Sequence, residues 1–180
     1  IPDLLAQMLT VPLWLFLRNA GRYESGKHWF YTLYRVGKGL KWQRLILHSV
    51  IGLSDVNMLL RKPEEALEWT KQTSQLAHRL DDHFYMAMAN YEVGHRLAHV
   101  EPTDSAANYL QNSYRLFETL ADARMAGWAA LYLGRCLRGL GRFDEAEDWT
   151  LASIIIANTV GHKRQIAYAL AQLVRLRVAQ

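Results

Sequence analysis

The chain has 180 residues, of which 51% are hydrophobic and 21% charged, and a net charge of +4. This composition is that of one soluble globular domain and excludes a disordered or collagen-like chain. No Lys/Arg cluster has the density expected of a nucleic-acid-binding segment. A single cysteine, Cys136, excludes an internal disulfide and favours a reducing, cytoplasmic compartment.

The N-terminal stretch is the most apolar part of the chain. Residues 4–17 read LLAQMLTVPLWLFL, a segment shorter than the roughly 20 residues that a membrane-spanning helix needs. It lacks the basic leader of a signal peptide. We therefore expect no contact with a membrane.

The next notable stretch runs from Gly21 to Lys27 and reads G-x-x-x-x-G-K, the spacing of a phosphate-binding loop. The Ser or Thr that would hold a magnesium ion is absent, because His28 follows Lys27. A related stretch, GRFDEAEDW at residues 141–149, shares Gly, Arg, an aromatic residue and the final Trp with GRYESGKHW at residues 21–29 but lacks the G-K pair. The stretch is therefore interpreted as a turn between two helices and not as a nucleotide site.

The two copies belong to a repeat with a period of 40 residues. A small residue recurs at Gly26, Ala66, Ala106 and Ala146. A large aromatic residue recurs at Trp29, Trp69, Tyr109 and Trp149. A second small site recurs at Ser54, Gly94 and Gly134. Four matched copies without an insertion predict one structural unit repeated along the whole chain.

Each unit is predicted to be a pair of antiparallel helices, because its apolar residues follow helical spacing throughout. Pro63 with Glu64 and Glu65 is typical of a helix start, as is the segment 102–104. The expected units are 1–40, 41–80, 81–120 and 121–160, followed by a terminal helix at 163–180. The predicted fold is all-α: an α-solenoid of antiparallel helix pairs with about nine helices, forming one domain over residues 1–180.

The recurring small residues indicate close crossings between the two helices of a pair. Gly134 faces Ala146 in the last pair, whereas in the first pair Trp14 takes the small site and faces Gly26. We interpret this exchange as compensation of volume across the contact. The recurring aromatics are expected to fill the gap between a pair and the first helix of its neighbour.

The run Leu133-Gly134, Leu137 and Gly141–Ala146 resembles the tetratricopeptide repeat (TPR). The 40-residue period, longer than the usual ~34 residues, resembles the variant arrays in C-terminal sensor regions of bacterial signal-transduction ATPases and maltose-activator-like transcription regulators. The resemblance implies a right-handed superhelix whose concave groove binds a protein, a peptide or a small inducer, without catalysis. Neither end carries a polar cap, so the chain is expected to be a segment of a longer array.

In this family the first helix of each pair lines the groove. The face so selected carries His48, Asp55, Tyr91, Glu92, His95, His99, Trp128, Tyr132, Arg135, Arg138, Tyr168, Gln172 and Arg175. Arginines beside tyrosines suit a carboxylate or a phosphate. The hypothesis is an acidic peptide or a small anionic ligand held by Arg135, Arg138 and Arg175.

Two alternatives stay open. Glu92, His95 and His99 have metal-ligand spacing on one helical face, which would suit a metal-dependent hydrolase. Single-stranded nucleic acid could bind along the basic end. The prediction is nevertheless a non-catalytic recognition scaffold without cofactor or metal, serving as the sensor or interaction domain of a bacterial signalling or transcription regulator.

Overall fold

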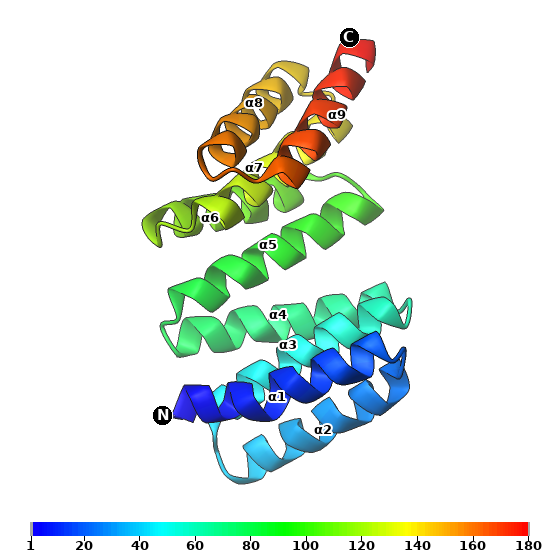
Figure 1. Ribbon diagram of the computed structural model, residues 1–180, viewed down its shortest axis with the longest axis vertical. Coiled ribbons are helices and arrows are strands. Elements are labelled where there is room, and N and C mark those ends of the chain that lie inside the picture. Colours follow the sequence, from blue (N-terminus) through cyan, green and yellow to red (C-terminus); the bar gives the residue numbers. More distant parts are fainter. Residues whose placement is uncertain (1, 180) are drawn as a thin grey trace. The chain divides into compact units, whose positions relative to one another are not determined.

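The computed structural model describes the backbone of residues 2–179 and the side chains of residues 4–99 and 101–178. Over this range the chain forms nine α-helices and no strand (Figure 1). The helices are α1 (Pro2–Asn19), α2 (Tyr23–Gly39), α3 (Gln43–Leu59), α4 (Pro63–Arg79), α5 (His83–Val100), α6 (Asp104–Thr119), α7 (Ala123–Gly139), α8 (Phe143–Thr159) and α9 (Lys163–Ala179). The all-α prediction is confirmed for this range, and none of its helices is long and apolar enough to cross a membrane.

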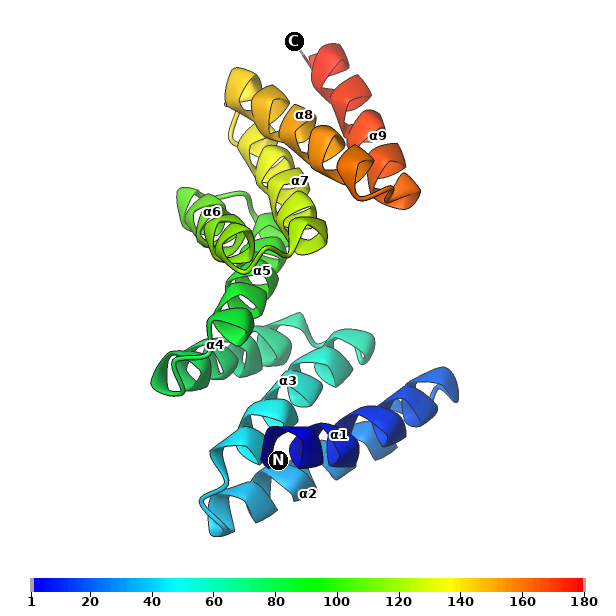
Figure 2. The same cartoon turned by 60° about the vertical axis from the view of Figure 1, so that its left-hand side comes forward.

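The helices form two compact units, which we describe separately. Unit 1 is residues 1–82 with α1 to α4, and unit 2 is residues 83–180 with α5 to α9 (Figure 2). Within each unit consecutive helices pack against each other. In addition, α1 contacts α3 in unit 1, while α7 contacts both α5 and α9 in unit 2. This is the packing of a solenoid of helix pairs, whereas one domain over 1–180 stays a prediction.

Seven turns between helices repeat one backbone geometry. Gly21, Gly141 and Gly161 have positive φ angles of 68°, 76° and 68°. The equivalent positions in four other turns are occupied by Lys41, Arg61, Asp81 and Ala121, with φ between 51° and 58°. In each of these turns the next residue donates its N–H back to a helix carbonyl, as Arg22 does to Leu17 at 2.8 Å. The turns are therefore left-handed caps that glycine suits best.

The G-x-x-x-x-G-K stretch lies in the first of these turns. Gly21 follows α1, and Ser25, Gly26 and Lys27 are already part of α2. No strand of the described chain leads into Gly21. The interpretation as a turn between helices is confirmed.

The predicted close crossings are present in both units. A Cβ added at Gly134 would lie 2.9 Å from the Ala146 carbonyl oxygen, and one added at Gly94 would lie 2.9 Å from that of Ala106. In α3 the site is Ser54, whose hydroxyl donates to the Ala66 carbonyl at 3.1 Å. These backbones approach so closely because no larger side chain separates them.

The exchange of volume in the first pair is confirmed as well. A Cβ added at Gly26 would lie 2.7 Å from the Trp14 ring. Trp14 is buried and meets the ring of Phe30 edge-on at 5.5 Å. The indole thus occupies the space that the smallest residue leaves open.

The recurring aromatics only partly follow the expectation. Trp29 packs against the buried cluster of Ala6, Leu33 and Leu45, which includes the following helix α3. Trp69 packs against a cluster that includes Trp14 of α1 and also meets Tyr34 of α2 at 5.6 Å. Trp149 meets Tyr114 of α6 at 4.9 Å. Both contacts are edge-to-face, the geometry that the ring quadrupoles favour. The indoles of Trp69 and Trp149 thus also contact second helices, which the repeat register did not predict.

Candidate functional site

One face of unit 2 gathers most of the residues predicted for the groove. Spacing of three or four residues places Tyr91, His95 and His99 on one side of α5. The same spacing places Trp128, Tyr132 and Arg135 on one side of α7. Tyr168 of α9 continues the row. We call the whole set the aromatic surface: Tyr91, His95, His99, Trp128, Tyr132, Arg135 and Tyr168.

Ring contacts connect the three helices across this surface. Tyr132 of α7 is the central ring, with its centroid 4.2 Å from that of His95 and 5.7 Å from that of Tyr91 on α5. Along α7 it lies 6.1 Å from Trp128 in a stacked arrangement. Trp128 in turn lies 5.9 Å from Tyr168 of α9. The surface is therefore one continuous array of rings, formed by residues that are far apart in sequence.

His95 is held neutral within this array. Burial lowers the pKa of His95 to about 4, and the nearby positive charges of His99, Arg96 and Arg135 act in the same direction. Its Nε2 atom is buried without a hydrogen-bond partner. Burial also raises the pKa of Tyr91 and that of Tyr132, so both phenols keep their protons at neutral pH.

Arg135 supplies a positive charge at the α5 side of the surface. Its guanidinium nitrogens lie 3.3 and 3.4 Å from the two ring nitrogens of His99. Only the unprotonated ring nitrogen can accept a hydrogen bond. Burial lowers the pKa of His99, and the charge of Arg135 lowers it further. At neutral pH the positive charge of this pair is therefore that of Arg135.

Glu92 does not join the two histidines. Its carboxylate pairs with Arg96 at 3.0 Å, and the Arg96 side chain is only 8% exposed. Burial raises the pKa of Glu92 although Arg96 opposes that shift. Within the described part of the chain, no group of three His, Cys, Asp or Glu side chains could hold a metal ion. The geometry thus gives no support to the hydrolase alternative.

The remaining predicted residues lie elsewhere. Gln172 is only 7% exposed, and its amide donates to the Leu131 carbonyl at 3.2 Å and to Thr150 Oγ1 at 2.9 Å. It is buried in the helix packing because Gly134 leaves room for its amide. Arg138 is half-buried and Arg175 exposed. No described ion pair joins either of them to another residue.

The two predicted residues of unit 1 differ from each other in exposure. His48 of α3 is buried, with 7% of its surface exposed. Asp55, two turns further along the same helix, is exposed. The positions 80 residues later in unit 2 are Trp128 and Arg135, and both are half-buried.

Two residues of the site escaped the sequence analysis. His162 meets the Trp128 ring edge-on at 5.8 Å, and the Arg164 guanidinium lies over the same ring at 5.8 Å. Arg164 precedes Tyr168 by four residues, so helical spacing alone places the two on one face. Extending the groove register to the start of the last helix would have found Arg164.

The fold and the aromatic surface together define a class: an all-α helical-repeat protein with an aromatic face that carries arginines. No protein-family model matches the chain, and no curated protein is similar enough in sequence to be a relative. The resemblance to the TPR therefore depends on the residues and the packing described above.

Proposed function

We propose that the chain is a non-catalytic, TPR-like recognition scaffold and that unit 2 binds a peptide segment of a partner protein across the aromatic surface. The observation that carries this proposal is the continuous contact among rings on α5, α7 and α9. Tyr, Trp and Arg are the residues that dominate the energetics of protein recognition. Tyr168 keeps 58% of its surface exposed and is available for contact.

The charges on this surface favour a segment that is both apolar and acidic. Arg135 lies beside His99 at one side, and Arg164 lies over Trp128 at the other. The carboxylate of Glu92 is already paired with Arg96. An extended peptide with an apolar or aromatic side chain and nearby Asp or Glu residues would thus meet rings and guanidinium groups together.

The proposal includes a cellular setting, which is the cytoplasm of a bacterial cell and a signalling or transcription regulator. The support is the 40-residue period and the single cysteine. The full open reading frame tests this part. A nucleotide-binding or helix-turn-helix module beside the array would support it, and a secretion signal would contradict it.

Peptide selection tests the binding proposal. A random display library is selected on the intact protein, and the affinity of the enriched peptides is measured by titration calorimetry. Tyr168→Ala and Arg135→Gln are each expected to weaken binding about 10-fold or more, since truncation of a central anchor costs about 1–3 kcal/mol. Phe16→Ala, which removes an exposed ring from α1 in unit 1, is the matched control and should leave the affinity unchanged.

Two outcomes would count against the proposal. One is a selection that enriches no peptide. The other is an enriched peptide that binds the Tyr168 and Arg135 variants as tightly as the unmodified protein. Circular dichroism of each variant shows whether its helices are intact.

A further inference from the structure

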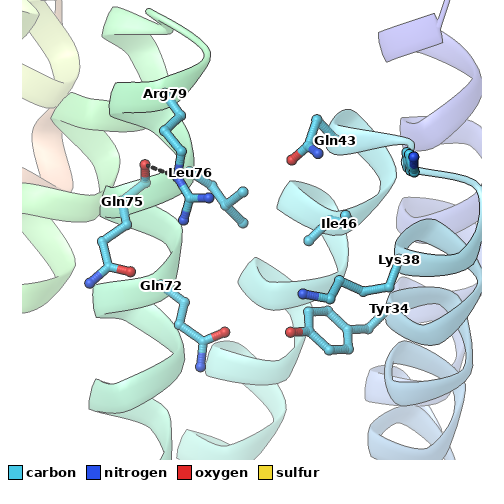
Figure 3. Close-up of a pocket in the computed structure, with 9 residues that line it drawn as sticks. Tyr34, Lys38, Gln43, Ile46, Gln72, Gln75, Leu76 and Arg79 are labelled. Atoms are coloured by element: carbon cyan, nitrogen blue, oxygen red, sulfur yellow. Dashed lines mark hydrogen bonds between the residues drawn. The ribbon is translucent and has the colours of Figure 1, made fainter.

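Unit 1 contains a cavity whose described lining includes no residue of the aromatic surface. It has a volume of about 350 Å³ and lies between α2 and α4, over the start of α3 (Figure 3). Small-molecule sites in proteins start at about 300 Å³. The cavity is therefore large enough for a small organic ligand and too small for a folded partner.

The charged side chains of the cavity all have the same sign. Lys38 from α2, Lys41 from the following turn and Arg79 from α4 line it, and no carboxylate is among its described lining residues. Figure 3 shows Lys38 on α2 and Arg79 on α4, on opposite sides of the space between these helices. Like charges gathered around one space raise its positive potential and attract anions.

These cations have little internal compensation. Lys38 lies over the ring of Tyr34 at 5.8 Å, and Arg79 Nε donates a long hydrogen bond of 3.4 Å to the Gln75 carbonyl. The nearby carboxylate of Asp82 is paired with Arg44. Among the described residues no ion pair neutralises Lys38, Lys41 or Arg79.

The position of the cations near helix ends explains only part of this arrangement. Lys38 lies in the last turn of α2 and Arg79 at the end of α4, where the helix dipole favours positive charge. The dipole does not require that both face the same cavity. Nor does it explain the neutral polar groups between them.

Those neutral groups are amides. Gln43, Gln72 and Gln75 line the same space, and each offers both a donor and an acceptor. Ile46 and Leu76 supply an apolar contact beside them. Cations, amides and a small apolar area together suit an organic anion that also carries hydroxyl or carbonyl groups.

We propose that this cavity binds a small organic polyanion, a phosphate monoester or a di- or tricarboxylate, with Lys38 and Arg79 contacting its charged groups from opposite sides. Arg79 can offer two parallel N–H groups to a carboxylate or phosphate, and Lys38 acts as a point charge. The three amides contact the uncharged polar groups. This site is independent of peptide binding by unit 2.

Titration calorimetry of the intact protein with glycerol 3-phosphate, with citrate and with glycerol tests the proposal. One or both anions should bind, more weakly as NaCl is raised, whereas neutral glycerol should not. Lys38→Gln and Arg79→Gln are each expected to weaken anion binding about 10-fold. Arg35→Gln removes an exposed cation of the same helix α2 that does not line the cavity, and it should change affinity less than about twofold.

The relative affinity of the two anions identifies the charged group as phosphate or carboxylate. The proposal is overturned if neither anion binds with a dissociation constant below about 10 mM, or if the cavity variants bind as well as Arg35→Gln. Thermal melting of each variant shows that unit 1 is still folded. Peptide binding by unit 2 provides a separate readout, so failure here is distinguishable from failure of the scaffold proposal.

Discussion

Equivalent positions of the repeat carry different side chains in unit 1 and in unit 2. His48, Gly52 and Asp55 of α3 stand 80 residues before Trp128, Tyr132 and Arg135 of α7. In unit 1 the Phe30 ring lies so close to Gly52 that an added Cβ would overlap it. In unit 2 the position of Phe30 is taken by Leu110, and Tyr132 instead meets the rings of α5.

This difference lies in the volume of the side chains at one helix crossing. A large ring on the second helix with glycine opposite closes the face as core. In unit 2 the equivalent Leu110 packs against Gly94 instead, where an added Cβ would lie 2.7 Å from Leu110 Cγ. Side-chain volume at one crossing therefore decides which residues of the facing helices can contact each other.

The largest expected effect concerns pH and the buried part of the aromatic surface. Because burial lowers the pKa of His95 to about 4 from 6.5, the unfolded chain binds a proton there between these values while the folded chain does not. Stability should be full above about pH 6.5 and fall toward pH 4, by up to about 3 kcal/mol. Denaturant unfolding at a series of pH values measures this loss.

The His95→Gln variant is the control for that measurement. It should show a flatter pH profile, with a residual slope from His99, whose pKa is also lowered. Equal slopes in the variant and the unmodified protein would contradict the assignment of His95 to a buried, neutral position.

The crossing of Phe30 and Gly52 in unit 1 provides the next test. Gly52→Ala should destabilise the protein by about 2–3 kcal/mol, because the ring must shift within a packed core. Gly39→Ala is the matched control, since Gly39 ends α2 with nothing within 4 Å of an added Cβ. Calorimetric melting of both variants measures the difference. If they melt at the same temperature, unit 1 is not closed by this contact.

The exchange of volume between Trp14 and Gly26 should give a smaller effect. Gly26→Ala places a methyl group 2.7 Å from the indole and is expected to cost about 1–2 kcal/mol. In a Trp14→Leu background the same change should cost much less. A double-mutant cycle measures the coupling, and additive effects would show that the two residues do not share the space.

The turns should give the smallest effect. Ala121 has φ of 55°, so Ala121→Gly is expected to stabilise unit 2 by about 0.5–1 kcal/mol through relief of left-handed strain. Gly141→Ala, at φ 76° with free space around an added Cβ, should destabilise by a similar amount. Thermal melting compares the two, and changes of the same sign would be inconsistent with strain at this position.

Sequence reasoning predicted the helices well because their signals are local and repeated. The 40-residue register located every pair, and Gly21, Gly141 and Gly161 lie in three of the turns between helices. The presence of Trp14 in place of a small residue could be predicted to be compensated by Gly26, because both occupy known positions of the repeat. The aromatic surface followed from the same register once the first helices were aligned.

The rest depended on contacts between residues far apart in sequence. The residues next to Trp69 in sequence do not indicate its ring contact with Tyr34. Likewise, Gln172 resembles a surface residue in the sequence, and only the structure shows that its amide fits beside Gly134. The cavity of unit 1 was missed because Lys38 and Arg79 lie on second helices, whereas the family resemblance directs attention to first helices. The repeat register predicts which position on a helix a residue occupies, whereas its side-chain contacts depend on how the neighbouring helices pack.

Hydrogen–deuterium exchange of the intact protein, with and without a peptide selected on it, tests the central claim most directly. Bound peptide should slow exchange in α5, α7 and α9 and leave α1 to α4 unchanged. Protection confined to the helices of unit 1, or to α6 and α8, would contradict recognition by the aromatic surface.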